Sequence, residues 1–146
     1  MHQKLIINTD GGARGNPGPA GIGVVIADEA GNIIGRYKQY IGEATNNVAE
    51  YKALILALTE SGKILNLKSE ILNLEIKMDS ELIVRQMQGR YKIKDVRLKQ
   101  LAGEVQKLLK NFSNAQFIHI PRELNQQADK LVNEAIDMAL AKTKIL

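Results

Sequence analysis

The segment LIINTDGGARGNPGPAGIG, residues 5–23, most constrains what this chain can fold into. It begins with an apolar run that ends in polar residues and Asp10, a pattern typical of a buried strand whose carboxyl end reaches the surface. The glycines and prolines that follow predict a rigid loop that a ligand can approach closely. A phosphate or ribose backbone suits such a loop, and a tight hairpin with an incidental aspartate is the alternative.

Composition limits the kind of protein that this chain can be. Its 146 residues and 45% hydrophobic content predict one domain, residues 1–146, with its own core. Cysteine is absent, which excludes disulfides and thiolate metal sites. The sequence contains neither a signal-peptide pattern nor an apolar run of membrane-spanning length, so we expect a cytoplasmic monomer with no membrane partner. The net charge of +4 favours a polyanionic partner.

Apolar runs and turn residues predict an α/β fold. Strands at 22–27 and 33–41, joined by a turn at 28–32, extend the first strand into an antiparallel meander. Helical spacing begins at Val48, after a cap at Thr45 or Asn46. The remaining expected elements are a long connection at 61–73, a strand at Leu72–Met78, helices at 81–88 and 96–112, a strand at 117–120 and a last helix capped by Asn125. This order predicts a mixed five-stranded sheet, three antiparallel strands followed by parallel ones, with helices on both faces.

Four acids stand at comparable places in this order. Asp10 and Asp79 end predicted strands, whereas Glu50 and Asp129 border the apolar faces of predicted helices near their starts. If the four converge, their repulsion raises their pKa values unless a cation is bound. Oxygen ligands without cysteine indicate Mg²⁺ or Mn²⁺, and two such ions serve in-line phosphoryl displacement. Each acid alone is more simply a surface or capping residue, since the chain holds 16 acids.

At these acids the sequence resembles the ribonuclease H type 1 family over nearly its whole length. The motifs are TDGGARGNPGPAGIG around Asp10, TNNVAEYKAL around Glu50, MDSELIV around Asp79 and HIPRELNQQADKLVN around Asp129. The resemblance implies a ribonuclease H fold in which these four acids are catalytic and bind two Mg²⁺ or Mn²⁺ ions. It also implies endonucleolytic cleavage of the RNA strand of an RNA/DNA hybrid, leaving a 5′-phosphate and a 3′-hydroxyl.

The resemblance further implies a substrate-binding set near the minor groove, where 2′-hydroxyls mark the RNA strand. Its members in this chain are Gly11, Gly12, Asn16, Asn46 and Asn47. The HIPRELNQQAD segment is similar to the archaeal-type, reverse-transcriptase-like branch, some of whose members also cut double-stranded RNA. In that branch Arg122 is a candidate substrate-binding cation, and a salt bridge to Glu123 or another acid is the alternative.

Two positions depart from the family pattern. Glu81 stands where well-known bacterial members have a glutamine. Because an acid is repelled by the phosphates of a nucleic acid, we assign Glu81 no contact with a base. His119 lies ten residues before Asp129, the spacing of the family's proton-shuttling histidine. Its neighbours predict a strand instead of a glycine-bearing loop, so a catalytic and a structural histidine both remain open.

The grip on the DNA strand and the function class also have alternatives. The chain has no tryptophan, so the Trp-bearing basic extension of some bacterial members has no counterpart. A smaller phosphate patch is predicted instead, with a solvated helix face as the alternative: Arg85, Arg90, Tyr91, Lys92 and Lys94. A non-catalytic hybrid-binding domain is the second function considered, but clustered acids repel a nucleic acid's phosphates. An exonuclease or integrase relative is a third alternative. It is disfavoured because such proteins share the architecture but lack the TDGG and TNN segments.

Overall fold

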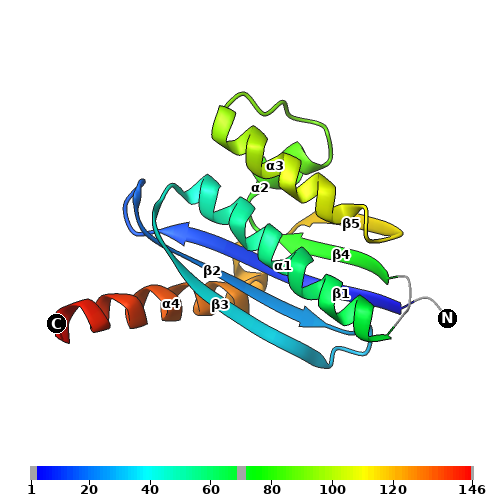
Figure 1. The fold of residues 1–146 in the computed structure, drawn as a ribbon, viewed down its shortest axis with the longest axis horizontal. Coiled ribbons are helices and arrows are strands. Elements are labelled where there is room, and N and C mark those ends of the chain that lie inside the picture. Colours follow the sequence, from blue (N-terminus) through cyan, green and yellow to red (C-terminus); the bar gives the residue numbers. More distant parts are fainter. Residues whose placement is uncertain (1–2, 69–71, 146) are drawn as a thin grey trace.

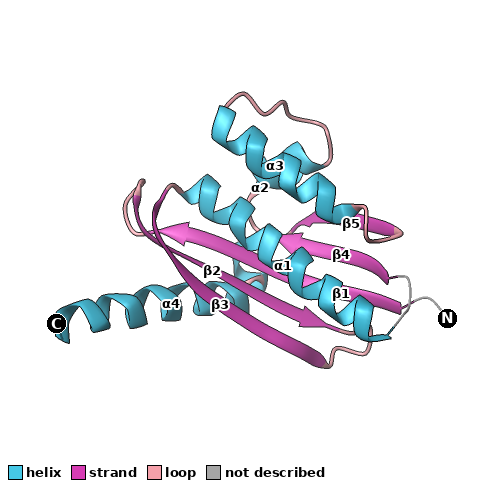
Figure 2. Cartoon of the chain, viewed as in Figure 1, coloured by secondary structure: helices cyan, strands magenta, loops and turns pink. Residues whose placement is uncertain are grey.

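The computed structural model describes residues 3–68 and 72–145. Within these ranges, five strands are combined with four α-helices (Figure 2), and three of the strands precede the first helix. The elements are β1 (Gln3–Ala13), β2 (Gly18–Ala27), β3 (Ile33–Ala44), α1 (Asn46–Lys68), β4 (Leu72–Met78), α2 (Glu81–Met87), α3 (Val96–Leu109), β5 (Asn114–His119), a 3₁₀ turn (Arg122–Leu124) and α4 (Gln126–Ile145).

The five strands form one sheet in the order β3-β2-β1-β4-β5. The first three strands are antiparallel, β4 is parallel to β1, and β5 is parallel to β4. Figure 1 shows α1 crossing one face of this sheet and α4 crossing the other. The predicted mixed sheet with helices on both faces is therefore confirmed. Because β1 is central, its polar residues lie beside both β4 and the covering helices.

The largest apolar cluster lies on the face of the sheet covered by α1. Leu5 and Ile7 of β1 belong to this cluster, and both are almost completely buried. Each large aliphatic side chain buried in this way contributes about 1.5–3 kcal/mol to folding. Side chains alternate along a strand, so Asn8 and Asp10 face the opposite side, toward α4. The packing of β1 thus decides which face of the sheet carries the first acid.

Glycines allow both covering helices to approach the sheet at backbone distance. A Cβ atom at Gly11 would lie 2.3 Å from the carbonyl carbon of Ala49 in α1. One at Gly23 would lie 2.4 Å from the carbonyl oxygen of Ala128 in α4. The sequence predicts that the glycines leave space for a ligand, but at Gly11 the backbone of α1 itself occupies that space.

Six predicted boundaries are wrong by three residues or more. The strand β2 begins four residues early, at Gly18, and β3 ends three residues late, at Ala44. The strand β1 does not end at Asp10, since its pairing with β2 continues to Ala13 and the glycine-rich loop shrinks to 14–17. Asp10 still follows the end of the parallel ladder, because pairing with β4 stops at Thr9 and Met78. The expected connection at 61–73 is helix as far as Lys68, with residues 69–71 outside the described ranges. The helix α3 ends three residues early, and β5 begins three residues early.

None of the described helices is long and apolar enough to cross a membrane.

Candidate active site

Three acids from three elements meet at the end of the parallel ladder. One carboxylate oxygen each from Asp10 of β1, Glu50 of α1 and Asp79 after β4 all lie within 4.8 Å of one another. The start of α1 is fixed by Thr45, whose hydroxyl accepts a hydrogen bond from the Val48 amide at 3.2 Å. Helix capping therefore places Glu50 on the first turns of α1, directly over the end of β1.

The fourth acid, Asp129, lies in the first turn of α4 and is only partly buried. It is not one of the three acids whose oxygens lie within 4.8 Å of one another. It lines the same cavity of about 400 Å³ as those three, and it is close enough to Asp10 to influence that carboxyl group. All four predicted acids therefore face one cavity.

The site carries more negative charge than the surrounding protein compensates. Burial, followed by the charges of Asp79 and Asp129, raises the pKa of Asp10 to about 8. Burial, followed by the charge of Asp10, also raises the pKa of Glu50 well above its ordinary value. The Gly11 amide opposes both shifts by donating to Asp10 at 3.0 Å and to Glu50 at 2.6 Å. A cluster of hard oxygen donors with this charge fits a divalent cation such as Mg²⁺ or Mn²⁺.

The raised pKa of Asp10 predicts how the stability of the metal-free protein depends on pH. Between the ordinary pKa of 3.8 and the folded value of about 8, the folded state holds a proton that the unfolded state releases. The free energy of unfolding should therefore fall by about 1 kcal/mol per pH unit as the pH rises through this window. Asp10→Asn should flatten the dependence and raise the melting temperature near pH ~8. Thermal melts in EDTA across this range test it, and parallel curves for the two proteins would contradict the raised pKa.

The structure brings most of the predicted substrate-binding residues to the acids. Gly11, Gly12, Asn46, Asn47 and Arg122 line the cavity with them. Within the described ranges Arg122 makes no ion pair, so the alternative of a salt bridge to Glu123 or another acid is not seen.

Asn16 does not line this cavity. Its side-chain oxygen accepts a hydrogen bond from the Asn46 amide at 3.0 Å, and the Asn46 side chain accepts one from the Ala13 amide at 2.8 Å. Asn16 and Asn46 therefore hold the 14–17 loop against the start of α1.

Other candidates lie outside the cavity. His119 lies in a strand, as its neighbours predict, and is the last residue of β5. Its side chain is exposed and does not line the cavity. Its partner in the sheet is Met78, which is fully buried on the face covered by α1. In the predicted phosphate patch, Arg85 donates to Gln88 at 3.0 Å, and the other members are exposed beyond α2. That patch stays a prediction.

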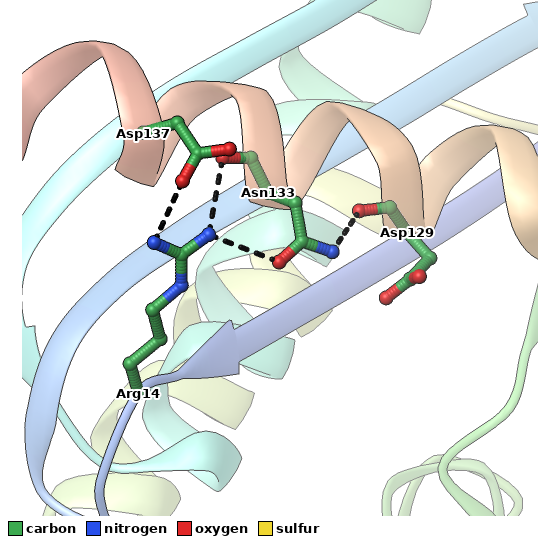
Figure 3. Close-up of polar contacts among 4 residues, drawn as sticks. All are labelled: Arg14, Asp129, Asn133 and Asp137. Atoms are coloured by element: carbon green, nitrogen blue, oxygen red, sulfur yellow. Dashed lines mark hydrogen bonds and ion pairs between the residues drawn. The ribbon is translucent and has the colours of Figure 1, made fainter.

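Sequence reasoning missed a link between the loop and α4. The Arg14 guanidinium pairs with Asp137 at 2.7 Å and donates to the Asn133 side chain at 3.3 Å. The side-chain NH₂ of Asn133 in turn donates to the backbone carbonyl of Asp129 at 3.0 Å (Figure 3). Because Arg14 and Asn133 are 119 residues apart, no local pattern in the sequence could reveal the pair.

Comparisons with known proteins agree with the geometry. The crystal structure of LC11-RNase H1 in complex with an RNA/DNA hybrid superposes with a TM-score of 0.89 and is 56% identical, covering 93% of this chain and 99% of that one. A family model described as reverse transcriptase-like matches residues 8–135, which include all four acids. The chain belongs to the reverse transcriptase-like branch of the ribonuclease H type 1 family.

Two further relatives are longer than this chain, which covers only part of each. The ribonuclease HI of Halobacterium salinarum is 38% identical over 130 residues, covering 89% of this chain and 63% of that protein. A bifunctional protein of Mycobacterium tuberculosis is 44% identical over 138 residues, covering 93% of this chain. The chain spans only 36% of the length of that mycobacterial relative.

Proposed function

We propose that this ribonuclease H-family chain is an endoribonuclease that hydrolyses the RNA strand of RNA/DNA hybrids, leaving 5′-phosphate and 3′-hydroxyl ends. The observation that carries the proposal is the meeting of Asp10, Glu50 and Asp79 oxygens within 4.8 Å. Support also comes from LC11-RNase H1, 56% identical, whose structure contains an RNA/DNA hybrid. A cysteine-free chain suits a reducing cytoplasm, where we propose that it acts as a monomer.

The proposed metal ligands are Asp10, Glu50, Asp79 and Asp129. Two Mg²⁺ or Mn²⁺ ions bound there would supply an activated water and stabilisation of the leaving oxygen. The Gly11 amide binds one oxygen of Asp10 and one of Glu50, which orients both carboxylates and leaves the second oxygen of each available as a ligand. Burial of these two side chains removes competing water from their charge.

The proposed substrate contacts come from two edges of the cavity. Asn46, Asn47 and the backbone of Gly12 supply amide groups suited to 2′-hydroxyls in the minor groove. Arg122, which makes no ion pair within the described ranges, supplies positive charge for a phosphate. A site with amides on one edge and a cation on another favours a duplex that contains an RNA strand.

A panel of end-labelled substrates tests the proposal. RNA/DNA hybrid, double-stranded RNA and single-stranded RNA are each incubated with the protein in Mg²⁺ or Mn²⁺. Internal cuts confined to the hybrid are the expected result, and cuts in both duplexes would extend the specificity to double-stranded RNA. A non-catalytic hybrid-binding domain would bind the hybrid in both metals and cut none of the substrates.

Two substitutions compare a residue that lines the cavity, Arg122, with one that does not, His119. We expect Arg122→Ala to lower kcat/KM for the hybrid by about tenfold, the loss typical of one charged hydrogen bond to phosphate. We expect His119→Ala to change kcat by less than about twofold, because its exposed side chain does not line the cavity. Steady-state rates of both variants at saturating metal give the comparison. A larger loss of kcat for His119→Ala than for Arg122→Ala would instead support a proton-shuttling histidine.

A further inference from the structure

Asn125 lies behind the acids, directly before α4, with only 1% of its surface exposed. Its side-chain nitrogen donates to the Thr9 carbonyl oxygen at 2.9 Å and to the Asp79 carboxylate at 3.0 Å. Its side-chain oxygen accepts from the side-chain NH₂ of Asn8 at 3.0 Å. Every polar atom of this buried side chain is therefore used, and one of its partners is a proposed metal ligand.

The orientation of this amide follows from the chemistry of its partners. The Thr9 carbonyl and an ionised Asp79 can only accept hydrogen bonds, so both must face the NH₂ group of Asn125. The Asn8 amide donates from the other side. A flipped Asn125 would leave two acceptors facing its oxygen without hydrogen bonds. Unsatisfied buried polar groups of this kind destabilise the fold and are rare in proteins.

Asn125 joins the three elements that carry Asp10, Asp79 and Asp129. Thr9 immediately precedes Asp10 on β1, and Asp79 directly follows β4. The backbone carbonyl of Asn125 accepts from the Asp129 amide at 3.1 Å, a bond of the first turn of α4. Asn125 thus contacts the carboxylate of Asp79, the backbone of the residue before Asp10 and the backbone of Asp129.

We propose that Asn125 is a positioning residue that fixes the Asp79 carboxylate and the start of α4 relative to β1, and so sets the geometry of the metal ligands. This inference rests on the proposed function of the four acids. Asn125 does not line their cavity; with Asn8 it lines a separate cavity of about 420 Å³. It therefore acts through Asp79 and α4, without touching the substrate.

The proposal explains why an asparagine stands at this position. Aspartate, serine and threonine would begin a helix comparably well, which is the role that the sequence pattern assigns to Asn125. An aspartate there would present oxygen to both the Thr9 carbonyl and the Asp79 carboxylate, with no proton to share. The position requires a donor on this side, so Asn125→Asp keeps the size and the helix start while removing the donated bonds.

The experiment measures Mn²⁺ binding to the protein by calorimetry without nucleic acid, and Mg²⁺-dependent hybrid cleavage in parallel. Asn125→Asp should weaken metal affinity about 10- to 100-fold, as lost support of a ligand typically does, and lower kcat comparably with KM for the hybrid within about twofold. Asn8→Ala, which removes only the bond to the Asn125 oxygen, should give a smaller loss in the same direction.

Val105→Ala is the matched control for stability, because it removes buried methyl groups from α3 in the core cluster. It should lower the melting temperature without changing metal affinity. Wild-type metal affinity in Asn125→Asp, or an equal loss in Val105→Ala, would overturn the inference. A wild-type protein that binds Mn²⁺ but cuts no substrate would refute the proposed function, whereas the calorimetric difference would still support the positioning role.

Discussion

Asp79→Asn is expected to reduce hybrid cleavage by at least ~10³-fold, because it removes a direct metal ligand. Substitution of a residue that only supports a ligand typically lowers activity about 10- to 100-fold, so the loss of the ligand itself should be larger. The change keeps the size of the side chain, and the new amide oxygen can still accept the bond from Asn125. Removing one charge from a crowded acidic site should leave hybrid affinity unchanged or stronger. Single-turnover cleavage and hybrid binding in EDTA measure the two effects separately.

Asp95→Asn is the matched control, since the same atoms change at the cap of α3, where Asp95 accepts from the Leu98 amide at 2.9 Å. Asparagine caps helices as well as aspartate does, so cleavage and stability should both be close to wild type. Cleavage by Asp79→Asn within about tenfold of wild type would show that Asp79 is not a metal ligand.

Gly11→Ala is expected to lower the free energy of unfolding by about 3 kcal/mol or more, which corresponds to a melting temperature ~10 °C lower. The added Cβ would lie 2.3 Å from the carbonyl carbon and oxygen of Ala49 and 2.6 Å from the amide nitrogen of Glu50. These are backbone atoms, which cannot rotate away, so α1 must shift from the sheet. The shift would also lengthen the bond from the Gly11 amide to the Glu50 side chain and impair catalysis.

Gly62→Ala provides the comparison within the same helix. A Cβ at Gly62 meets nothing within 4 Å, so the substitution should stabilise α1 by about 0.5–1 kcal/mol. Urea denaturation of both variants gives the two free energies. Similar stabilities for Gly11→Ala and Gly62→Ala would contradict the close contact between β1 and α1.

Local patterns in the sequence predicted most of the elements and singled out the four acids that line one cavity. The helix α2 begins at the predicted residue, Glu81, where the Ser80 hydroxyl accepts from the Ile83 amide at 3.3 Å. Thr45, one of two predicted caps, caps α1. Such patterns succeed because capping and hydrophobic spacing depend on residues within one or two turns.

The errors arose where distant contacts decide the structure. Residues 11–13 read as loop because glycine is a poor strand former, but pairing with β2 and close packing of α1 make them strand. The helix α1 was expected to end before Gly62, yet it continues because that glycine lies in open space and costs only about 1 kcal/mol.

Site residues with distant partners were also missed. Asn125 was predicted as a helix cap, and its contacts with Asn8 and Thr9 span 117 and 116 residues. Arg14 was not singled out, because its partners on α4 are equally remote. Acids are found from motifs that surround them, whereas the residues that hold them in place are found only once the sheet and α4 are assembled.

Cleavage of an RNA/DNA hybrid labelled in turn on each strand is the most direct test of the four-carboxylate site. The wild-type protein in Mg²⁺ or Mn²⁺ should cut the RNA strand at internal positions, leave 5′-phosphate and 3′-hydroxyl ends, and leave the DNA strand intact. A folded protein that binds the hybrid but cuts neither strand in either metal would contradict the proposed chemistry and favour a binding domain.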